Sequence, residues 1–189
     1  MNNLLVLLMV VPLLVGIFLV FIPNYIHIHR WSTFVSLLIN AGLSFWVLQH
    51  IVNNGIVTVD FGNWEAPFGI SFVGDSFSVL LVLTTNIVSA ICVLYAIKTI
   101  GLSREKMYFY PFVLFLVAGV NGSFLTGDLF NLFVTFEVML LASYALITLG
   151  GTKKQLQESF KYIAINVVSS SLFLVAIAYL YGLLGTLNM

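Results

Sequence analysis

The sequence predicts an all-α integral membrane protein with about six transmembrane helices and with its N- and C-termini outside the cell. Hydrophobic residues make up 61% of the 189 positions and charged residues only 7%, whereas a soluble domain carries roughly 25% charged residues. The apolar residues form runs close to the about 20 residues with which a helix crosses a bilayer. All Lys and Arg residues lie in or beside alternate connections, which the positive-inside rule assigns to the cytoplasm.

The first two apolar runs cover residues 4–21 and 33–52. Because the N-terminus lacks the basic segment of a cleaved signal peptide, we expect the first run to remain in the protein. His27, His29 and Arg30 are expected in the loop between these runs. Because no third ligand lies near these two histidines, we expect no metal site there.

The segment 53–74 is the longest polar stretch, and we expect it on the outer surface. Val57, Val59 and Phe61 alternate with other residues, and this period of two predicts a small β-hairpin lying on the membrane, although Pro67 interrupts it. The segment contains no Lys or Arg, and its acids are Asp60 and Glu65.

A basic loop joins the third and fourth apolar runs. Asp75 opens the third run, where the helix dipole favours an acid. The loop 98–106 carries positive charge, and the aromatic residues 108–110 that follow it are typical of a membrane interface. Pro111 falls in the first turn of the fourth run, where its missing N–H does little harm, and this run ends near Leu125.

The fifth run, 127–151, has Asp128 at one end and one carboxylate in its interior, Glu137. A helix rises about 1.5 Å per residue, so Glu137 lies roughly 13 Å below Asp128 and near the middle of a hydrocarbon core about 30 Å thick. A charge at that depth costs about 2.5–3.5 kcal/mol even on lenient insertion scales, so such a residue is expected to serve a function. The alternative is a protonated Glu137 that only forms hydrogen bonds to a neighbouring helix.

A buried carboxylate is expected to pair with a cation at its own depth. The sixth run begins near Ser159 and holds Lys161 about one turn inside it, roughly 12 Å from the depth of Glu137. Lys161 is therefore expected to reach towards the interface and to pair with Glu158 at i, i+3. Either the partner of Glu137 is absent from this chain, or Glu137 is neutral at rest.

The residues from Gly119 to Glu137 resemble the signature of the antiporter-like membrane subunits. This family comprises the large subunits of multisubunit (Mrp-type) sodium/proton antiporters and the proton-pumping subunits of respiratory complex I. Residues 62–70, 150–153 and 161–188 are most similar to the D subunit of the Mrp-type antiporter. The resemblance extends over the whole chain.

The resemblance implies a longer subunit that contains two inverted helix repeats. Residues 1–107 would be three leading transmembrane helices with the external loop 53–74. Residues 108–189 would be the first three helices of the first repeat, which is then incomplete. The family's glutamate maps onto Glu137, and its partner lysine would lie beyond Met189.

Two further residues of this chain match the family's charged positions. Asp75 corresponds to the acid at the head of the third span, and Lys161 to a lysine near the start of the sixth. The resemblance makes both of them possible relay residues beside Glu137.

The implied function is that of a membrane subunit of a cation (sodium)/proton antiporter in the bacterial plasma membrane, with Glu137 in a proton pathway. The expected partners are the other subunits of the complex, the remainder of the same subunit, the lipid bilayer, and Na+ and H+ as transported ions, with no cofactor, metal or nucleic acid. The alternatives are a proton-pumping subunit of a complex I-type NADH:quinone oxidoreductase and a non-transporting membrane scaffold. No nucleophile–base pair, phosphate-binding glycine loop or metal-ligand cluster indicates an enzyme.

Overall fold

The computed structural model describes residues 2–23, 25–64 and 69–189, and these residues form the predicted all-α membrane fold. The long helices are α1 (Asn2–Val20), α2 (Ile26–Asn54), α3 (Ser76–Thr99), α5 (Phe109–Leu125), α6 (Leu129–Thr148) and α7 (Lys153–Leu184). The shorter elements are β1 (Val57–Asp60), the 3-10 turn η1 (Phe61–Asn63), β2 (Ser71–Gly74) and α4 (Leu102–Glu105).

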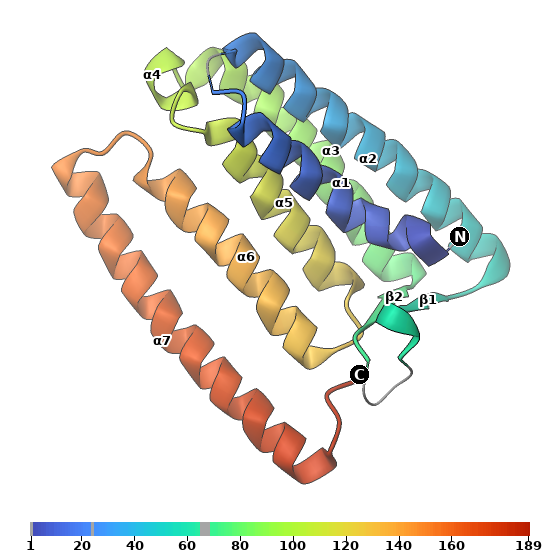
Figure 1. Ribbon diagram of the computed structural model, residues 1–189. Helices are drawn as coiled ribbons and strands as arrows, with labels where there is room; N and C mark the ends of the chain where they lie inside the picture. Colours follow the sequence, from blue (N-terminus) through green and yellow to red (C-terminus); the bar gives the residue numbers. More distant parts are fainter. Residues whose placement is uncertain (1, 24, 65–68) are drawn as a thin grey trace.

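Helices α1, α2, α3 and α5 form one bundle, and α6 and α7 lie beside it as two further layers (Figure 1). Helix α6 packs against α5, and α7 packs against α6. Helix α7 is therefore the least covered helix, and Ser159 and Ile177 are its buried residues. The N and C marks both lie near the end of the bundle that carries the hairpin (Figure 1).

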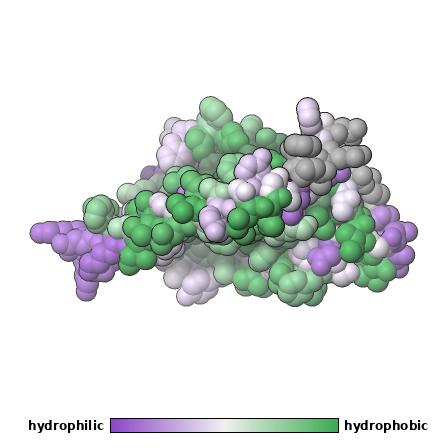
Figure 2. Space-filling view, turned by 90° about the horizontal axis from the view of Figure 1, so that it is seen from below, coloured by the Kyte–Doolittle hydropathy of each residue, from purple (hydrophilic) through white to green (hydrophobic). Residues whose placement is uncertain are grey.

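The outer surface of this bundle suits lipid. Helices α2, α3, α6 and α7 are long and apolar enough to cross a membrane, and α1 and α5 are shorter apolar helices. The 17 residues of α5 rise about 25 Å, which is close to the thickness of the hydrocarbon core. Figure 2 shows that hydrophobic side chains cover most of the face it presents, while hydrophilic ones gather mainly at its edges.

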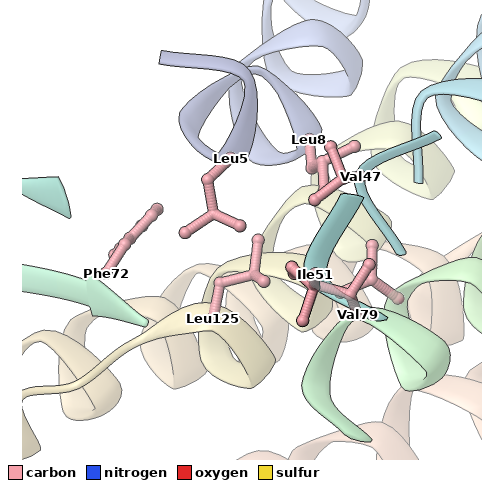
Figure 3. Close-up of a cluster of buried hydrophobic side chains, with 8 residues drawn as sticks. Leu5, Leu8, Val47, Ile51, Phe72, Val79 and Leu125 are labelled. Carbon is pink, nitrogen blue, oxygen red and sulfur yellow. The ribbon is translucent and has the colours of Figure 1, made fainter. Parts of the chain in front are cut away.

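An apolar cluster at the hairpin end packs all four helices of the bundle, α1, α2, α3 and α5, against strand β2 of the hairpin (Figure 3). Its members are Leu5, Leu8, Val47, Ile51, Phe72, Val79, Val82 and Leu125. Gly74 makes this packing possible, because a Cβ there would overlap the Cδ1 atom of Leu5. A second cluster, built around Tyr110 and Leu114, packs other parts of the same bundle.

The predicted hairpin is confirmed: β1 pairs with β2 in antiparallel register from Val57 opposite Gly74 to Asp60 opposite Ser71. It is also hydrogen-bonded to the turn between α5 and α6, because the Gly127 amide donates to the Ser71 carbonyl over 2.9 Å. Glu65 and Pro67, which were expected within this segment, lie outside the described residues.

Two helices begin earlier than predicted. Helix α2 begins at Ile26, so His27, His29 and Arg30 lie in its first turns and the prediction of a loop there is wrong. Helix α7 begins at Lys153 instead of near Ser159. Both starts carry polar residues that a search for apolar runs excludes.

The start of α7 has a clear local cause. The Thr152 hydroxyl accepts a hydrogen bond from the Gln155 amide, which satisfies one of the free N–H groups at the helix start. Lys, Gln and Glu are good helix formers, so the polar first turns of α7 continue directly into its apolar part.

The orientation of the bundle is a prediction that cysteine labelling tests. In a Cys92→Ser background, a cysteine replacing the exposed Thr58 of β1 should react with an impermeant thiol reagent in intact cells. A cysteine replacing the exposed Ser103 of α4 should react only after the membrane is permeabilised, because α4 lies in the basic connection. The reverse labelling pattern would show that the orientation is inverted.

Candidate functional site

Glu137 lies in the middle of α6, nine residues after the cap of that helix, as the sequence predicts. The cap is Asp128, whose carboxylate accepts a hydrogen bond from the backbone N–H of Asn131 over 2.7 Å. The Oε1 atom of Glu137 is buried and has no hydrogen-bond partner among the described residues. A buried carboxyl oxygen without a hydrogen bond lowers the stability of the fold by about 1–3 kcal/mol or more, so a carboxyl group at this position destabilises the protein.

A cavity of about 390 Å³ lies against Glu137, between α6 and α7. The α6 side of the cavity is apolar apart from Glu137, and Phe133 and Phe136 belong to it. The α7 side carries three polar residues, Asn166, Ser169 and Ser170. Their spacing of three and four residues places them on one face of α7.

The polar residues of this cavity supply no charge to Glu137. The side-chain Nδ2 of Asn166 donates to the Tyr162 carbonyl. The Ser169 and Ser170 hydroxyls donate to backbone carbonyls about one turn earlier in α7. Their remaining oxygen atoms are acceptors, which suit water or a protonated carboxyl group. Within the described part of the chain, the cavity lining therefore contains no cation that would balance an ionised Glu137.

Lys161 does not reach the cavity beside Glu137. Its Nζ atom lies 3.0 Å from Oε1 of Glu158, and both side chains are largely exposed, which confirms the predicted i, i+3 pair. The neighbouring Tyr162 packs edge-to-face on Tyr144 at a ring separation of 5.7 Å. Since Tyr144 lies seven residues beyond Glu137 in α6, the depths of Lys161 and Glu137 differ by about 10 Å.

Asp75 forms a complete capping box at the start of α3. Its carboxylate accepts from the Ser78 amide at 2.7 Å, and the Ser78 hydroxyl accepts from the Asp75 amide at 3.0 Å. Hydrogen bonds from Ser78 hold the pKa of Asp75 below its usual range. The structure thus gives Asp75 a local structural role and does not bring it together with Glu137 or Lys161.

The structure contains a buried acid that the sequence pattern did not indicate, Glu105 of α4. Arg30 of α2 contacts it with two donors, Nε to Oε1 at 3.1 Å and Nη2 to Oε2 at 2.6 Å. The Tyr110 hydroxyl of α5 donates to the same carboxylate over 2.6 Å. Tyr110 is fully buried, so the prediction that residues 108–110 form an interfacial belt is wrong for this residue.

Glu105 stays ionised because its partners outweigh its burial. Burial raises the pKa of Glu105, but the hydrogen bonds from Arg30 and Tyr110 and the positive charge of Arg30 together bring the pKa below its usual range. This carboxylate is therefore a fixed anion that ties α4 to α2 and α5. The buried Oε1 atom of Glu137, in contrast, has no hydrogen-bond partner among the described residues.

Helix α6 is held close to α5 on the side that flanks Glu137. A Cβ atom at Gly119 would lie 2.8 Å from the backbone nitrogen of Met139, and one at Gly122 would lie 2.8 Å from Cγ2 of Thr135. The two glycines thus allow the helices to approach at the residues on either side of Glu137. Close approach through small residues is the usual way in which membrane helices pack without a hydrophobic driving force.

Among the described residues, no group of three or more His, Cys, Asp or Glu side chains lies close enough together to hold a metal ion. His29 instead forms a hydrogen bond with the Ile22 carbonyl through Nε2, at 2.6 Å, which closes the turn between α1 and α2.

Comparison with known proteins supports the resemblance seen in the sequence. Residues 126–189 match the family model described as NADH:quinone oxidoreductase/Mrp antiporter, TM. Over all 189 residues the chain is 50% identical to the D subunit of the Na(+)/H(+) antiporter of Alkalihalophilus pseudofirmus. The chain covers 38% of the length of that relative.

Solved structures agree on the fold. A chain in the structure of the Mrp complex from Dietzia sp. DQ12-45-1b superposes with a TM-score of 0.91 and 31% identity, covering 99% of this chain and 35% of that one. A chain of the membrane-bound sulfane sulfur reductase, an archaeal respiratory membrane complex, superposes with a TM-score of 0.88 and 28% identity, covering 97% of this chain and 38% of that one. Over its whole length the chain is therefore similar to the N-terminal part of the D subunit of the multisubunit Na+/H+ antiporters, and it spans less than half the length of the relatives it matches.

Proposed function

We propose that this chain acts within the membrane subunit of a cation (sodium)/proton antiporter, in which Glu137 exchanges protons along the transport pathway. The observation that carries the proposal is the position of Glu137 in mid-helix, with its Oε1 atom unpaired among the described residues beside a cavity lined by Asn166, Ser169 and Ser170. A carboxyl group with no fixed counter-charge can bind and release a proton, whereas a permanently ion-paired one such as Glu105 cannot do so readily.

The partners follow from the same proposal. They are the other subunits of the antiporter complex and the remainder of the same subunit beyond Met189, which would bring a cation to Glu137. Lys161 and Asp75 are weaker candidates for the relay, because the structure pairs each of them with a neighbour on its own helix.

Sodium dependence separates this proposal from a second candidate. This second candidate is a proton-pumping subunit of a respiratory complex. The similarity to a chain of an archaeal respiratory membrane complex favours it. Such a subunit would move protons in response to electron transfer and would need no sodium.

We therefore propose to express the full-length subunit with its partner subunits in a host that lacks its own sodium/proton antiporters. In everted vesicles acidified by respiration, added NaCl should release protons from the lumen, and choline chloride at equal ionic strength should not. Proton movement that follows electron transfer and ignores sodium would favour the respiratory candidate. No proton movement under either condition would favour a scaffold.

A further inference from the structure

Two buried asparagines from different helices donate to one backbone carbonyl of a third helix, and a third buried asparagine accepts from one of them. Asn40 of α2 and Asn121 of α5 both donate through Nδ2 to the Leu8 carbonyl of α1, at 2.9 and 3.0 Å. Asn40 also donates to Oδ1 of Asn86 in α3 at 3.0 Å. All four residues are fully buried. We call this group the Leu8 node.

The Leu8 carbonyl is available to the asparagines because of Pro12. In a regular helix the N–H of residue 12 would donate to the carbonyl of residue 8, but proline has no N–H. A carbonyl without a donor inside a membrane costs several kcal/mol. The side chains of Asn40 and Asn121, one from α2 and one from α5, donate in place of the missing N–H.

The amide orientations at the Leu8 node are fixed by these contacts. Reversing the Asn40 amide would place its oxygen against two other acceptors, the Leu8 carbonyl and Oδ1 of Asn86. Asn86 is itself anchored, since its Nδ2 donates to the Val82 carbonyl over 2.7 Å. The node thus fixes the relative rotation and depth of α1, α2, α3 and α5.

The Leu8 node is connected to Glu137 through α5. Asn121 joins α5 to the node, and Gly119 and Gly122 on the same helix set the contact with α6 at Met139 and Thr135. These two α6 residues lie on either side of Glu137. A shift of α5 relative to α1 would therefore be transmitted to the backbone that carries this carboxylate.

We propose that Pro12, Asn40 and Asn121 are positioning residues that set the place of Glu137 through the Leu8 node. This inference rests on the proposed function of Glu137 for its consequence, while the node itself can be tested without it. A misplacement of about 1 Å can change the rate of a reaction about 100-fold. Variation at the node should therefore change proton exchange through the position of Glu137.

The test uses Pro12→Ala, Asn121→Leu and the double variant in the full-length subunit. Asn121→Leu should lower the thermal stability of the detergent-solubilised complex, because one of the two donors to the Leu8 carbonyl is lost. Pro12→Ala alone should bring no gain in stability, although Ala is the far better helix former, because the new N–H competes with the asparagines. In the double variant the new N–H replaces the lost donor, so Pro12→Ala should restore much of the stability lost in Asn121→Leu.

Two outcomes would overturn the Leu8 node. One is a clear gain in stability in Pro12→Ala alone, and the other is a double variant no more stable than Asn121→Leu. Pro111→Ala is the matched control, because Pro111 lies in the first turn of α5, where no carbonyl inside the helix loses a donor. If Asn121→Leu does not assemble, Asn121→Ala in the same comparison keeps the test in place.

The link to Glu137 has its own readout. At equal amounts of assembled protein, Asn121→Leu should exchange protons about tenfold more slowly, with a shifted pH for half-maximal exchange, and the double variant should recover both. An unchanged pH profile in Asn121→Leu would contradict the positioning role. If the rescue of stability occurs but wild-type vesicles show no sodium-driven exchange, the node stands and the proposed function fails.

Discussion

Replacing Glu137 by Gln should abolish sodium/proton exchange or reduce it at least about 100-fold, while Glu137→Asp should keep part of it. Gln preserves the shape of the side chain and its hydrogen-bonding capacity but cannot bind and release a proton, which a relay requires. Asp keeps the carboxyl group and shortens the reach by one methylene. The measurement is exchange in everted vesicles, compared at equal amounts of assembled complex.

A scaffold role for Glu137 predicts the opposite order. In that case Gln would be tolerated, and Asp would disturb the packing of α6 against α5 and α7. Ser171→Ala is a suitable control on the facing helix, because Ser171 is exposed and is not among the residues that line the cavity. This control variant should keep the exchange rate of the wild-type protein.

The second large effect is expected at the pair of Arg30 and Glu105. Arg30→Gln should lower the stability of the subunit by about 3–5 kcal/mol, because it leaves a buried carboxylate with no cation. The Glu105 side chain is only 1% exposed, against 18% for that of Arg30. Glu105→Gln should do less damage, since Arg30 lies nearer to the surface and can reach water.

The double variant Arg30→Met, Glu105→Met should be much closer to wild-type stability than Arg30→Gln, because both charges are removed together. Lys161→Gln is the matched control, since Lys161 and Glu158 form an exposed pair and such pairs contribute little. If Lys161→Gln destabilised the subunit as much as Arg30→Gln, Glu105 could not be the buried anion whose pairing with Arg30 holds α4 to α2.

The pair also gives stability a defined dependence on pH. The pKa of Glu105 is lower in the folded protein than in the unfolded chain, so the unfolded chain binds the proton more readily. The stabilisation by Glu105 is therefore complete at neutral pH and is lost as the pH falls through its folded pKa. The thermal midpoint of the wild-type subunit should fall on acidification, and this fall should be smaller in the double methionine variant.

The sequence predicted those features that depend on near neighbours. Hydropathy located the long helices, and period-two alternation located the hairpin of β1 and β2. The pair of Lys161 and Glu158 was predicted, because an i, i+3 pair needs only a few residues of sequence. Asp75 was expected at the head of α3 from the helix dipole, but its capping box with Ser78 was not predicted. The division into leading helices and an incomplete repeat stays a prediction.

Contacts between distant residues were not predictable in the same way. Arg30 and Glu105 are separated by 75 positions, and Glu105 sits between two basic residues in a stretch typical of an exposed loop. Asn40 and Asn121 lie within or at the end of apolar runs, and only the packed bundle shows that both reach the Leu8 carbonyl. Pro12 within an apolar run was the one local sign that a carbonyl lacked its donor.

Glu137 should change its protonation state during exchange, and infrared difference spectroscopy of the reconstituted complex can detect that change. Spectra recorded before and after sodium addition should show the C=O stretch of a buried carboxylic acid, which marks a carboxyl group that gains or loses a proton. The band should be absent in Glu137→Gln and should remain in Glu105→Gln, whose acid is fixed as an anion in the wild-type protein. A band that persists unchanged in Glu137→Gln would show that another group carries the proton.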